Sequence, residues 1–294
     1  MNSPFRISVI TDEISQDFGR ACEVASQEFG MGWVELRELW NKNIMKLDAK
    51  EIAEARRLLE KYKLRVSDLA TPLFKVDWPG VPLNKNRLAA RDKFSADFTF
   101  AQQGEVLERS LELARVFVVD RIRCFDFWRL DDPAPVRAAM DARLLEAAEK
   151  CGEKNIVLVI ENEHECNTGT GPEALRTLNA VRSPHFMLNW DPGNAVALND
   201  VPYPDSYDKL PKERIGHVHC KDVARKTDGK DGVWACMGKG VIDWTGQFHA
   251  LKRDGYKLAV SLETHWRGAG TAEESSRQSW AGMKEQLHTA GALS

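Results

Sequence analysis

Residues 215–223 read Ile-Gly-His-Val-His-Cys-Lys-Asp-Val, a short apolar run that ends in titratable side chains. Side chains alternate between the two faces of a β-strand, so His217 and His219 share one face. If that face lines a barrel, His217 lies one layer deep, His219 stands at the rim, and Lys221 and Asp222 follow on the loop. Such groups are costly near a core unless a metal or a substrate uses them. The other interpretation is a surface strand with two hydrogen-bonded histidines.

Seven other short apolar segments alternate with segments of helical periodicity along the chain. The expected strands are residues 6–10, 33–37, 64–69, 119–124, 156–160, 186–191, 215–223 and 258–262. The expected helices are residues 18–29, 48–61, 94–115, 135–151, 172–181, 243–253 and 271–289, with Asp48 as an N-cap. Strict alternation implies parallel strands joined by right-handed crossovers, and eight such units close naturally into a barrel.

The fold class that follows is α/β, a single (β/α)8 TIM barrel formed by residues 1–294. The unbroken apolar run at 156–160 is typical of a parallel strand buried on both faces. A doubly wound open sheet is the alternative. It is disfavoured because no glycine-rich phosphate-binding turn follows the first strand.

The composition narrows the classes of function. The 294 residues are 43% hydrophobic and carry a net charge of -3, unlike a general nucleic-acid or membrane-surface binder. No apolar stretch approaches the roughly 20 residues that span a bilayer, and the first residues do not form a secretory signal. The six scattered cysteines predict reduced thiols in a cytoplasmic protein.

Four consecutive strand ends supply Glu161, Asp191, His219 and Glu263. The carboxyl ends of barrel strands form one rim, where catalytic groups gather. Three carboxylates and one imidazole suit one divalent ion, with Mn²⁺ or Mg²⁺ preferred and Co²⁺, Ni²⁺ or Zn²⁺ also compatible. Taken singly, each residue has another interpretation, because a strand-end Glu can cap a helix and Asp before Pro-Gly is a common turn former.

Several motifs resemble the xylose isomerase-like TIM-barrel superfamily, and more closely its sugar phosphate isomerase/epimerase branch. They are Val34-Glu35-Leu36-Arg37, Ile160-Glu161-Asn162, Asp191-Pro192-Gly193-Asn194, His217-Val218-His219-Cys220-Lys221-Asp222, residues 238–244 (Gly-Lys-Gly-Val-Ile-Asp-Trp) and Ser261-Leu262-Glu263. The resemblance covers nearly the whole chain. It indicates the superfamily but no particular substrate.

The resemblance implies one divalent ion held by Glu161, Asp191, His219 and Glu263. In the ketose epimerases of the family, the two glutamates also exchange protons on opposite faces of the reacting carbon, while the metal stabilises an enediolate. Lys221 would stabilise the same oxyanion or bind a substrate carboxylate or phosphate. The alternative for Lys221 is a solvated loop lysine paired with Asp222.

The sequence departs from the epimerase pattern at two positions. Those enzymes carry a second acid a few residues after the first metal Glu and a His three residues after the metal Asp. Asn167 and Asn194 stand in these neighbourhoods. Because of this departure, the sequence does not decide between a sugar epimerase and a related enzyme that uses the same metal site.

Tryptophans are frequent in the loops that follow the strands, where their flat faces would stack on a sugar or cyclic polyol. Contact within a dimer through the same loops is the alternative. His164 is expected to have a structural role only. The candidate substrate contacts are Glu35, Trp40, Trp128, Asn194, His217, His265 and Arg267.

The favoured function is a metal-dependent isomerase or epimerase that moves a proton next to a carbonyl of a small carbohydrate-like substrate. A dehydratase acting on an inosose- or dehydroshikimate-like compound would use the same metal and base. An endonuclease of abasic sites is disfavoured by the seven histidines and the pI near 6.2. A non-catalytic sugar-binding barrel would tolerate loss of a metal ligand. No nucleic-acid or membrane partner is expected, and a homodimer or homotetramer is compatible with the loops.

Overall fold

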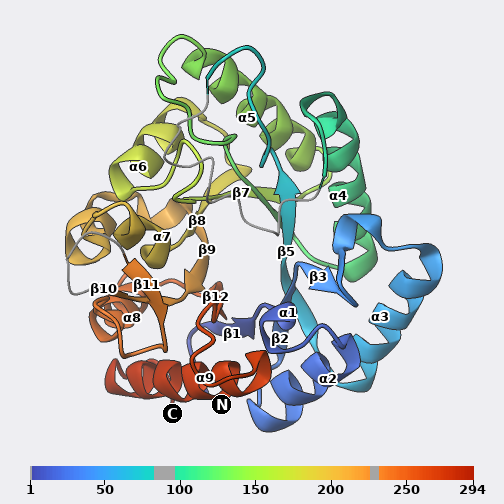
Figure 1. Cartoon of the computed structure of the whole chain (residues 1–294), viewed down its shortest axis with the longest axis vertical. Coiled ribbons are helices and arrows are strands. Elements are labelled where there is room, and N and C mark those ends of the chain that lie inside the picture. The colour runs from blue at the N-terminus through green and yellow to red at the C-terminus, as the bar shows by residue number, and fades with distance from the viewer. Residues whose placement is uncertain (1, 83–96, 226–231) are drawn as a thin grey trace.

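The computed structural model describes residues 2–82, 97–225 and 232–294. Eight parallel strands form a barrel there, and the helices surround it on the outside (Figure 1). The strand order is β1-β12-β9-β8-β7-β6-β5-β2, and a parallel bridge between Ile10 and Glu35 joins the two ends. The predicted (β/α)8 fold class is therefore confirmed.

Each barrel strand is short, and each lies where the sequence predicted a strand. The barrel strands are β1 (Arg6–Val9), β2 (Trp33–Leu36), β5 (Arg65–Leu73), β6 (Arg121–Cys124), β7 (Val157–Glu161), β8 (Phe186–Trp190), β9 (Ile215–Cys220) and β12 (Ala259–Leu262). Two small antiparallel pairs lie outside the barrel sheet, namely β3 (Glu38–Leu39) with β4 (Lys42–Asn43) and β10 (Asp222–Arg225) with β11 (Gly232–Ala235).

The helices follow the strands in turn. They are α1 (Thr11–Ile14), α2 (Phe18–Glu23), α3 (Ala49–Lys61), α4 (Gln103–Phe117), α5 (Arg137–Gly152), α6 (Gly171–Ala180), α7 (Pro192–Ala197), α8 (Trp244–Arg253) and α9 (Ala272–Thr289). Shorter helical turns are η1 (Val24–Glu28), η2 (Ile44–Lys46), η4 (Phe100–Gln102), η5 (Pro202–Ser206), η6 (Tyr207–Lys209) and η7 (Lys212–Arg214). Asp48 caps α3 as predicted, because its carboxylate accepts hydrogen bonds from the backbone N–H groups of Lys50 and Glu51.

Four predicted elements differ from the structure. The expected helix 18–29 changes to a wider helical turn at η1, and the expected strand 64–69 continues to Leu73. The expected strand 215–223 leaves the barrel after Cys220, because the next residues pair with β11 instead. Residues 94–96 of the expected helix 94–115 lie outside the described residues, residues 97–99 are not helical, and α4 begins at Gln103 after the turn η4.

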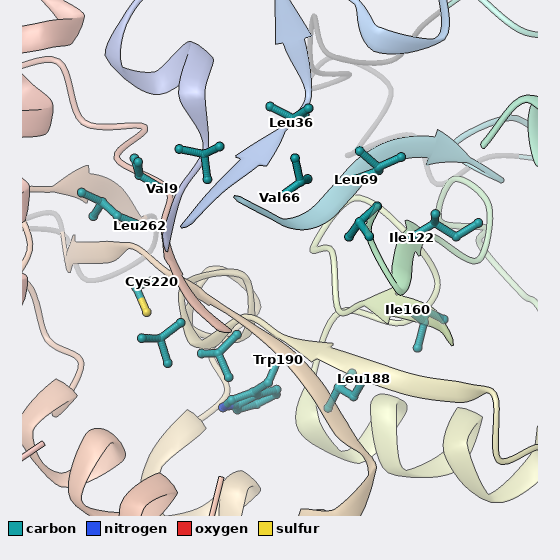
Figure 2. Close-up of a cluster of buried hydrophobic side chains, with 14 of the residues drawn as sticks. Val9, Leu36, Val66, Leu69, Ile122, Ile160, Leu188, Trp190, Cys220 and Leu262 are labelled. Carbon is teal, nitrogen blue, oxygen red and sulfur yellow. The ribbon is translucent and has the colours of Figure 1, made fainter. Parts of the chain in front are cut away.

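The strands separate apolar and polar side chains with a period of two. The apolar set packs between the sheet and the helices and forms the main core (Figure 2). It includes Val9, Leu36, Leu69, Ile122, Ile160, Leu188, Trp190, Cys220 and Leu262. The stability of the fold therefore rests mainly on this outer layer.

The alternate residues place a polar network inside the barrel. Glu35 on β2 reaches across to His217 and His219 on β9, and Arg123 on β6 reaches Glu161 on β7. The usual interior of such a barrel is filled by branched apolar side chains. A polar interior is costly to bury, so it points to chemistry near the barrel axis.

An extra residue on β5 adds a further acid to this interior. Val34 pairs with Val66 and Glu35 pairs with Asp68, so the register gains one residue at Ser67. The Ser67 hydroxyl forms a hydrogen bond of 2.7 Å with the Ser8 hydroxyl on β1. Both Ser67 and Asp68 are buried. Bulges of this kind are over-represented next to active sites, where they redirect side chains.

Asp222 anchors the β10–β11 hairpin at the rim. Its carboxylate accepts hydrogen bonds from the backbone N–H groups of Val223, Gly238 and Gly240 at 2.9, 3.0 and 2.9 Å. A Cβ atom on Gly240 would lie 2.1 Å from Oδ1 of Asp222. The close approach explains why glycine stands there, and it fixes the hairpin beside the end of β9.

Within residues 2–82, 97–225 and 232–294, every helix is too short or too polar to cross a membrane. The six cysteines, all inside these ranges, are free thiols as predicted.

Candidate active site

The four predicted metal ligands lie together at the carboxyl ends of four neighbouring strands. Glu161 ends β7, Asp191 follows β8, His219 lies near the end of β9, and Glu263 follows β12. One possible ligand atom from each residue lies within 4.8 Å of one from every other, and all four residues are buried. The structure thus brings the four side chains to one point, and their binding of a metal stays a prediction.

Local structure fixes the carboxylate of Asp191. Its Oδ1 accepts a hydrogen bond from the backbone N–H of Asn194 at 2.9 Å and so caps α7. The Asn162 side chain holds the backbone N–H of Asp191 at 2.7 Å. Oδ2 of Asp191 is buried and accepts no hydrogen bond of normal geometry, although Lys221 Nζ lies 2.8 Å away. One oxygen therefore serves the fold and the other faces the site.

His219 presents its two ring nitrogens in different directions. Nε2 lies 2.9 Å from Oε1 of Glu35. Nδ1 faces the carboxylates of Glu161, Asp191 and Glu263 at 3.3, 3.7 and 3.5 Å. Nδ1 is consequently the nitrogen that could bind an ion held by those three carboxylates.

Lys221 is buried beside two of the candidate ligands. Its Nζ donates a hydrogen bond to Oε2 of Glu263 at 2.6 Å and lies 2.8 Å from Oδ2 of Asp191. The alternative of a solvated lysine paired with Asp222 is wrong, because Asp222 is bound to the backbone of its own hairpin. The structure places a positive charge directly at the cluster of acids.

Two buried arginines support the candidate glutamates, and the sequence prediction missed both. Arg123 donates to Oε2 of Glu161 at 2.8 Å, and Arg37 donates to Oε1 of Glu263 at 2.8 Å. Burial alone would raise the pKa of Glu161, but Arg123 and His219 outweigh it and lower the pKa to about 2. Burial of Glu263 is likewise outweighed, chiefly by Lys221, and its pKa lies well below the usual range. Both glutamates are therefore ionised at neutral pH.

Asn194 and His164 continue the site toward α7. The Asn194 amide donates to Oε1 of Glu161 at 3.1 Å, and its oxygen lies 3.0 Å from Nδ1 of His164. His164 Nδ1 also lies 2.7 Å from Oε1 of Glu163. The predicted Asn194 therefore lies beside the candidate ligand Glu161, and His164 lies next to it, while the structural role expected for His164 stays a prediction.

His265 and Arg267 share one buried carboxylate at the rim. Nδ1 of His265 lies 2.9 Å from Oε1 of Glu13, and Arg267 donates to Oε2 of Glu13 at 2.5 Å. His265 Nε2 lies 3.5 Å from Oε1 of Glu263. His265 is thus beside the candidate metal ligands, whereas Arg267 is mainly engaged by Glu13.

The two tryptophans predicted as substrate contacts lie in different environments. Trp128 is buried, and Lys75 Nζ lies 5.3 Å from its ring centroid. Trp40 packs edge-on against Phe18 with ring centroids 5.6 Å apart, and its contact with a substrate stays a prediction.

Glu35 and His217 lie beneath the four candidate ligands and are fully buried. Nε2 of His217 lies 2.9 Å from Oε2 of Glu35, so both oxygens of Glu35 are bound by histidines. The position of His217 one layer deeper than His219 agrees with the sequence. Contact of either residue with a substrate stays a prediction, because the four candidate ligands are buried to the same extent.

Trp234 on β11 lies over the same cluster. Lys221 Nζ is 5.0 Å from its ring centroid, and the rings of His265 and His164 are 5.1 and 6.1 Å away. In the sequence, Trp234 is one of five tryptophans in the loops after the strands, with Trp40, Trp78, Trp128 and Trp266, and nothing local distinguishes it from the others. The hairpin that carries it supplies an apolar face above the acids.

The residues present fit a divalent ion. Three carboxylates and one imidazole nitrogen converge, and Oδ2 of Asp191 is buried without a hydrogen bond of normal geometry. Such a mixed oxygen and nitrogen set suits Mg²⁺, Mn²⁺ or Zn²⁺.

The sequence of residues 24–286 matches the family described as the xylose isomerase-like TIM barrel. The chain belongs to this family. A search among curated proteins found no significant match. The match over residues 24–286 confirms the predicted superfamily.

Solved structures of related barrels are similar over nearly the whole chain. One is the probable 3-DHS dehydratase AsbF of Bacillus anthracis, with 19% identity, a TM-score of 0.71, and coverage of 97% of this chain and 99% of that chain. Another is the IolI protein with a bound zinc atom, with 16% identity, a TM-score of 0.72, and coverage of 99% and 100%. A third is D-allulose 3-epimerase from Methylomonas sp., with 16% identity, a TM-score of 0.67, and coverage of 98% and 99%. At these identities the similarity shows the fold.

Proposed function

We propose that this chain is a divalent-metal-dependent isomerase or epimerase that moves a proton next to a carbonyl of a sugar or related polyol. The observation that carries the proposal is the convergence of Glu161, Asp191, His219 and Glu263 at the rim. Two of the similar barrels support the proposal, namely the IolI protein with its bound zinc atom and the D-allulose 3-epimerase. A bound ion would polarise the substrate carbonyl and increase the acidity of the adjacent C–H.

Glu161 and Glu263 are the proposed proton-transfer groups. They come from β7 and from the end of β12, and both remain carboxylates because of Arg123, Arg37 and Lys221. A carboxylate with a low pKa is a weak base, so it abstracts a carbon-bound proton only from an acidified C–H. The low pKa of Glu161 is therefore consistent with a metal-assisted reaction.

Lys221 and Trp234 are proposed to act on the substrate itself. The Lys221 ammonium lies between Asp191 and Glu263 and would stabilise negative charge that develops on a substrate oxygen. Trp234 covers this position with an aromatic face suited to the C–H groups of a sugar or cyclic polyol. Asn194 and His164 would form hydrogen bonds with hydroxyl groups of the substrate.

A dehydratase is the second candidate, and the positions of Asn167 and Asn194 favour it. Asn167 accepts from the backbone N–H of Leu130 at 3.0 Å and donates to three carbonyl oxygens of residues 126–128, so it holds a loop. Asn194 binds Glu161 and His164. Neither supplies the acid or imidazole of the epimerase pattern. The similarity to a probable dehydratase supports the same alternative.

The experiment begins with metal content measured by elemental mass spectrometry on the wild type, His219→Ala and Glu263→Gln. We expect about one divalent ion per chain in the wild type and loss of the ion in both variants. Wild-type protein without an ion after incubation with Mn²⁺ or Zn²⁺ would refute the metal centre and leave the non-catalytic sugar-binding alternative.

Ketoses, inososes and dehydroshikimate-like compounds are then incubated with the metal-loaded protein in heavy water. Incorporation of deuterium without loss of water indicates an isomerase or epimerase, and loss of water indicates a dehydratase. Glu161→Gln and Glu263→Gln should each lower the rate by about 10²- to 10⁴-fold. Full activity in both variants would exclude the proposed proton-transfer groups.

A further inference from the structure

Glu35 lies against one of the two ring nitrogens of His219. Nε2 of His219 lies 2.9 Å from Oε1 of Glu35, and Nδ1 faces the carboxylates of Glu161 and Glu263. A neutral imidazole has one N–H donor and one lone pair. With its proton on Nε2, His219 donates to Glu35 and leaves the Nδ1 lone pair on the side of the candidate ion, where Asn189 Nδ2 also lies 3.3 Å away.

His217 holds the other end of the same carboxylate. Its Nε2 lies 2.9 Å from Oε2 of Glu35, and the rings of His217 and His219 are nearly perpendicular at 86° with centroids 5.3 Å apart. All three side chains are fully buried. Glu35 is therefore bound at both oxygens and is not free to rotate away from His219.

The position of Glu35 in the fold adds rigidity. Glu35 lies on β2 and pairs with Asp68 at the point where β5 carries its extra residue, while both histidines lie on β9. The two hydrogen bonds thus cross the barrel interior between separate strands. A side chain held in this way controls the direction of its partner, as carboxylates behind metal-bound histidines do.

We propose that Glu35 is a positioning residue that fixes His219 with Nδ1 toward the metal centre, with His217 as the anchor of Glu35. The inference rests on the proposed function, since it presupposes an ion at His219. The three groups could also hold a second ion, because their ligand atoms lie within 4.8 Å of one another. Their mutual hydrogen bonds of 2.9 Å favour the positioning role.

The test compares Co²⁺ binding by the wild type, Glu35→Gln and Asp126→Asn. Asp126 is a matched control, because it is also a fully buried carboxylate but binds Thr168 and Arg137 away from the cluster. Glu35→Gln should weaken Co²⁺ affinity about 10- to 100-fold, as is typical when such a partner is changed. Asp126→Asn should keep the wild-type affinity.

Proton NMR of the Co²⁺-loaded protein in water gives a readout that a general structural defect would not produce. The wild type should show one exchangeable, hyperfine-shifted N–H signal from Nε2 of His219, protected by Glu35. The signal should persist in Asp126→Asn and disappear through solvent exchange in Glu35→Gln. If Glu35→Gln does not fold, His217→Gln replaces it, and a weaker affinity with a faster-exchanging signal is expected.

The outcomes separate the two proposals. A wild type that takes up no Co²⁺ overturns the metal centre itself. A wild type and Glu35→Gln with equal affinity and the same N–H signal overturn only the positioning role. Two ions in the wild type and one in Glu35→Gln would show that Glu35 is itself a metal ligand, and this result would also overturn the positioning role.

Discussion

Replacing Asp68 by Asn should change how the stability of the protein depends on pH. Asp68 is fully buried in the barrel interior, and neither carboxylate oxygen has a hydrogen-bond partner within the described ranges. Burial raises its pKa from 3.8 to about 6; His217 opposes the rise and Glu35 adds to it. The folded protein therefore holds this proton more tightly than the unfolded chain does.

The sign follows from the raised pKa. Below the unfolded pKa of 3.8 the carboxyl is protonated in both states and has no effect on the pH dependence. Between pH 3.8 and about 6 the unfolded chain loses this proton while the folded protein still holds it, so the folded state is progressively destabilised, and the effect levels off once the buried acid ionises. The difference between 3.8 and about 6 corresponds to about 3 kcal/mol at high pH. By the same relation, Asp68 already lowers the free energy of unfolding by about 1 kcal/mol at about pH 4.5.

The assay is urea unfolding of metal-free wild type and Asp68→Asn at pH 4.5 and pH 8, followed by circular dichroism. The free energy of unfolding of the variant minus that of the wild type should be about 2 kcal/mol larger at pH 8 than at pH 4.5. Asp120→Asn is the control, because the pKa of Asp120 is lowered: Arg121 beside it outweighs partial burial. Asp120 stays ionised across this range, so its difference should be flat. A flat difference for Asp68→Asn would refute the reasoning.

Two further changes test the packing around the site. Arg37→Met should lower the free energy of unfolding by about 3–5 kcal/mol at pH 7, because it leaves the buried carboxylates of Asp12, Glu13 and Glu263 without their shared cation; a loss below about 1 kcal/mol in urea unfolding would contradict this. Gly240→Ala should destabilise by about 1–3 kcal/mol, because its Cβ would lie 2.1 Å from Oδ1 of Asp222. The control is Gly32→Ala, because a Cβ atom added at Gly32 would have no atom within 4 Å. Equal thermal midpoints for the two variants would count against Asp222 as the anchor of the hairpin.

The strands and their ends were predictable because each strand combines an apolar run with a polar residue at its carboxyl end. Glu161, Asp191, His219 and Glu263 could be placed at one rim from strand ends alone, since parallel strands in a barrel share that edge. The start of α7 at Pro192 was not predicted, because Asp before Pro-Gly is a common turn former as well as a common beginning of a helix.

The hairpin β10–β11 could not be predicted in the same way. Residues 222 and 223 continue the pattern of β9, and the strand leaves the barrel because Asp222 binds backbone groups of Gly238 and Gly240. These partners are distant in the sequence. The position of Trp234 above Lys221 depends on this hairpin and was equally hidden.

The buried arginines gave a local signal that was not used. Arg37 lies two residues after Glu35, and Arg123 lies two residues after Arg121, so each pair shares one strand face. An arginine on the inward face of a barrel strand must find an acid there. Arg123 finds Glu161 on the neighbouring strand β7, whereas the contact of Arg37 with Glu263 depends on barrel closure.

The two faces of each barrel strand carry separate tasks, and this has a consequence for how such a chain can change over evolutionary time. Ile160 packs under the helices while its neighbour Glu161 stands in the site, and Cys220 and His219 divide in the same way. Substitutions on the inward positions can alter the reaction while the outer layer keeps the chain folded. Insertion or deletion of one residue within a strand exchanges the two sets, unless a bulge absorbs it as the extra residue at Ser67 on β5 does. Point substitution inside the strands is therefore the simplest route to new chemistry, and a change of strand length requires a bulge.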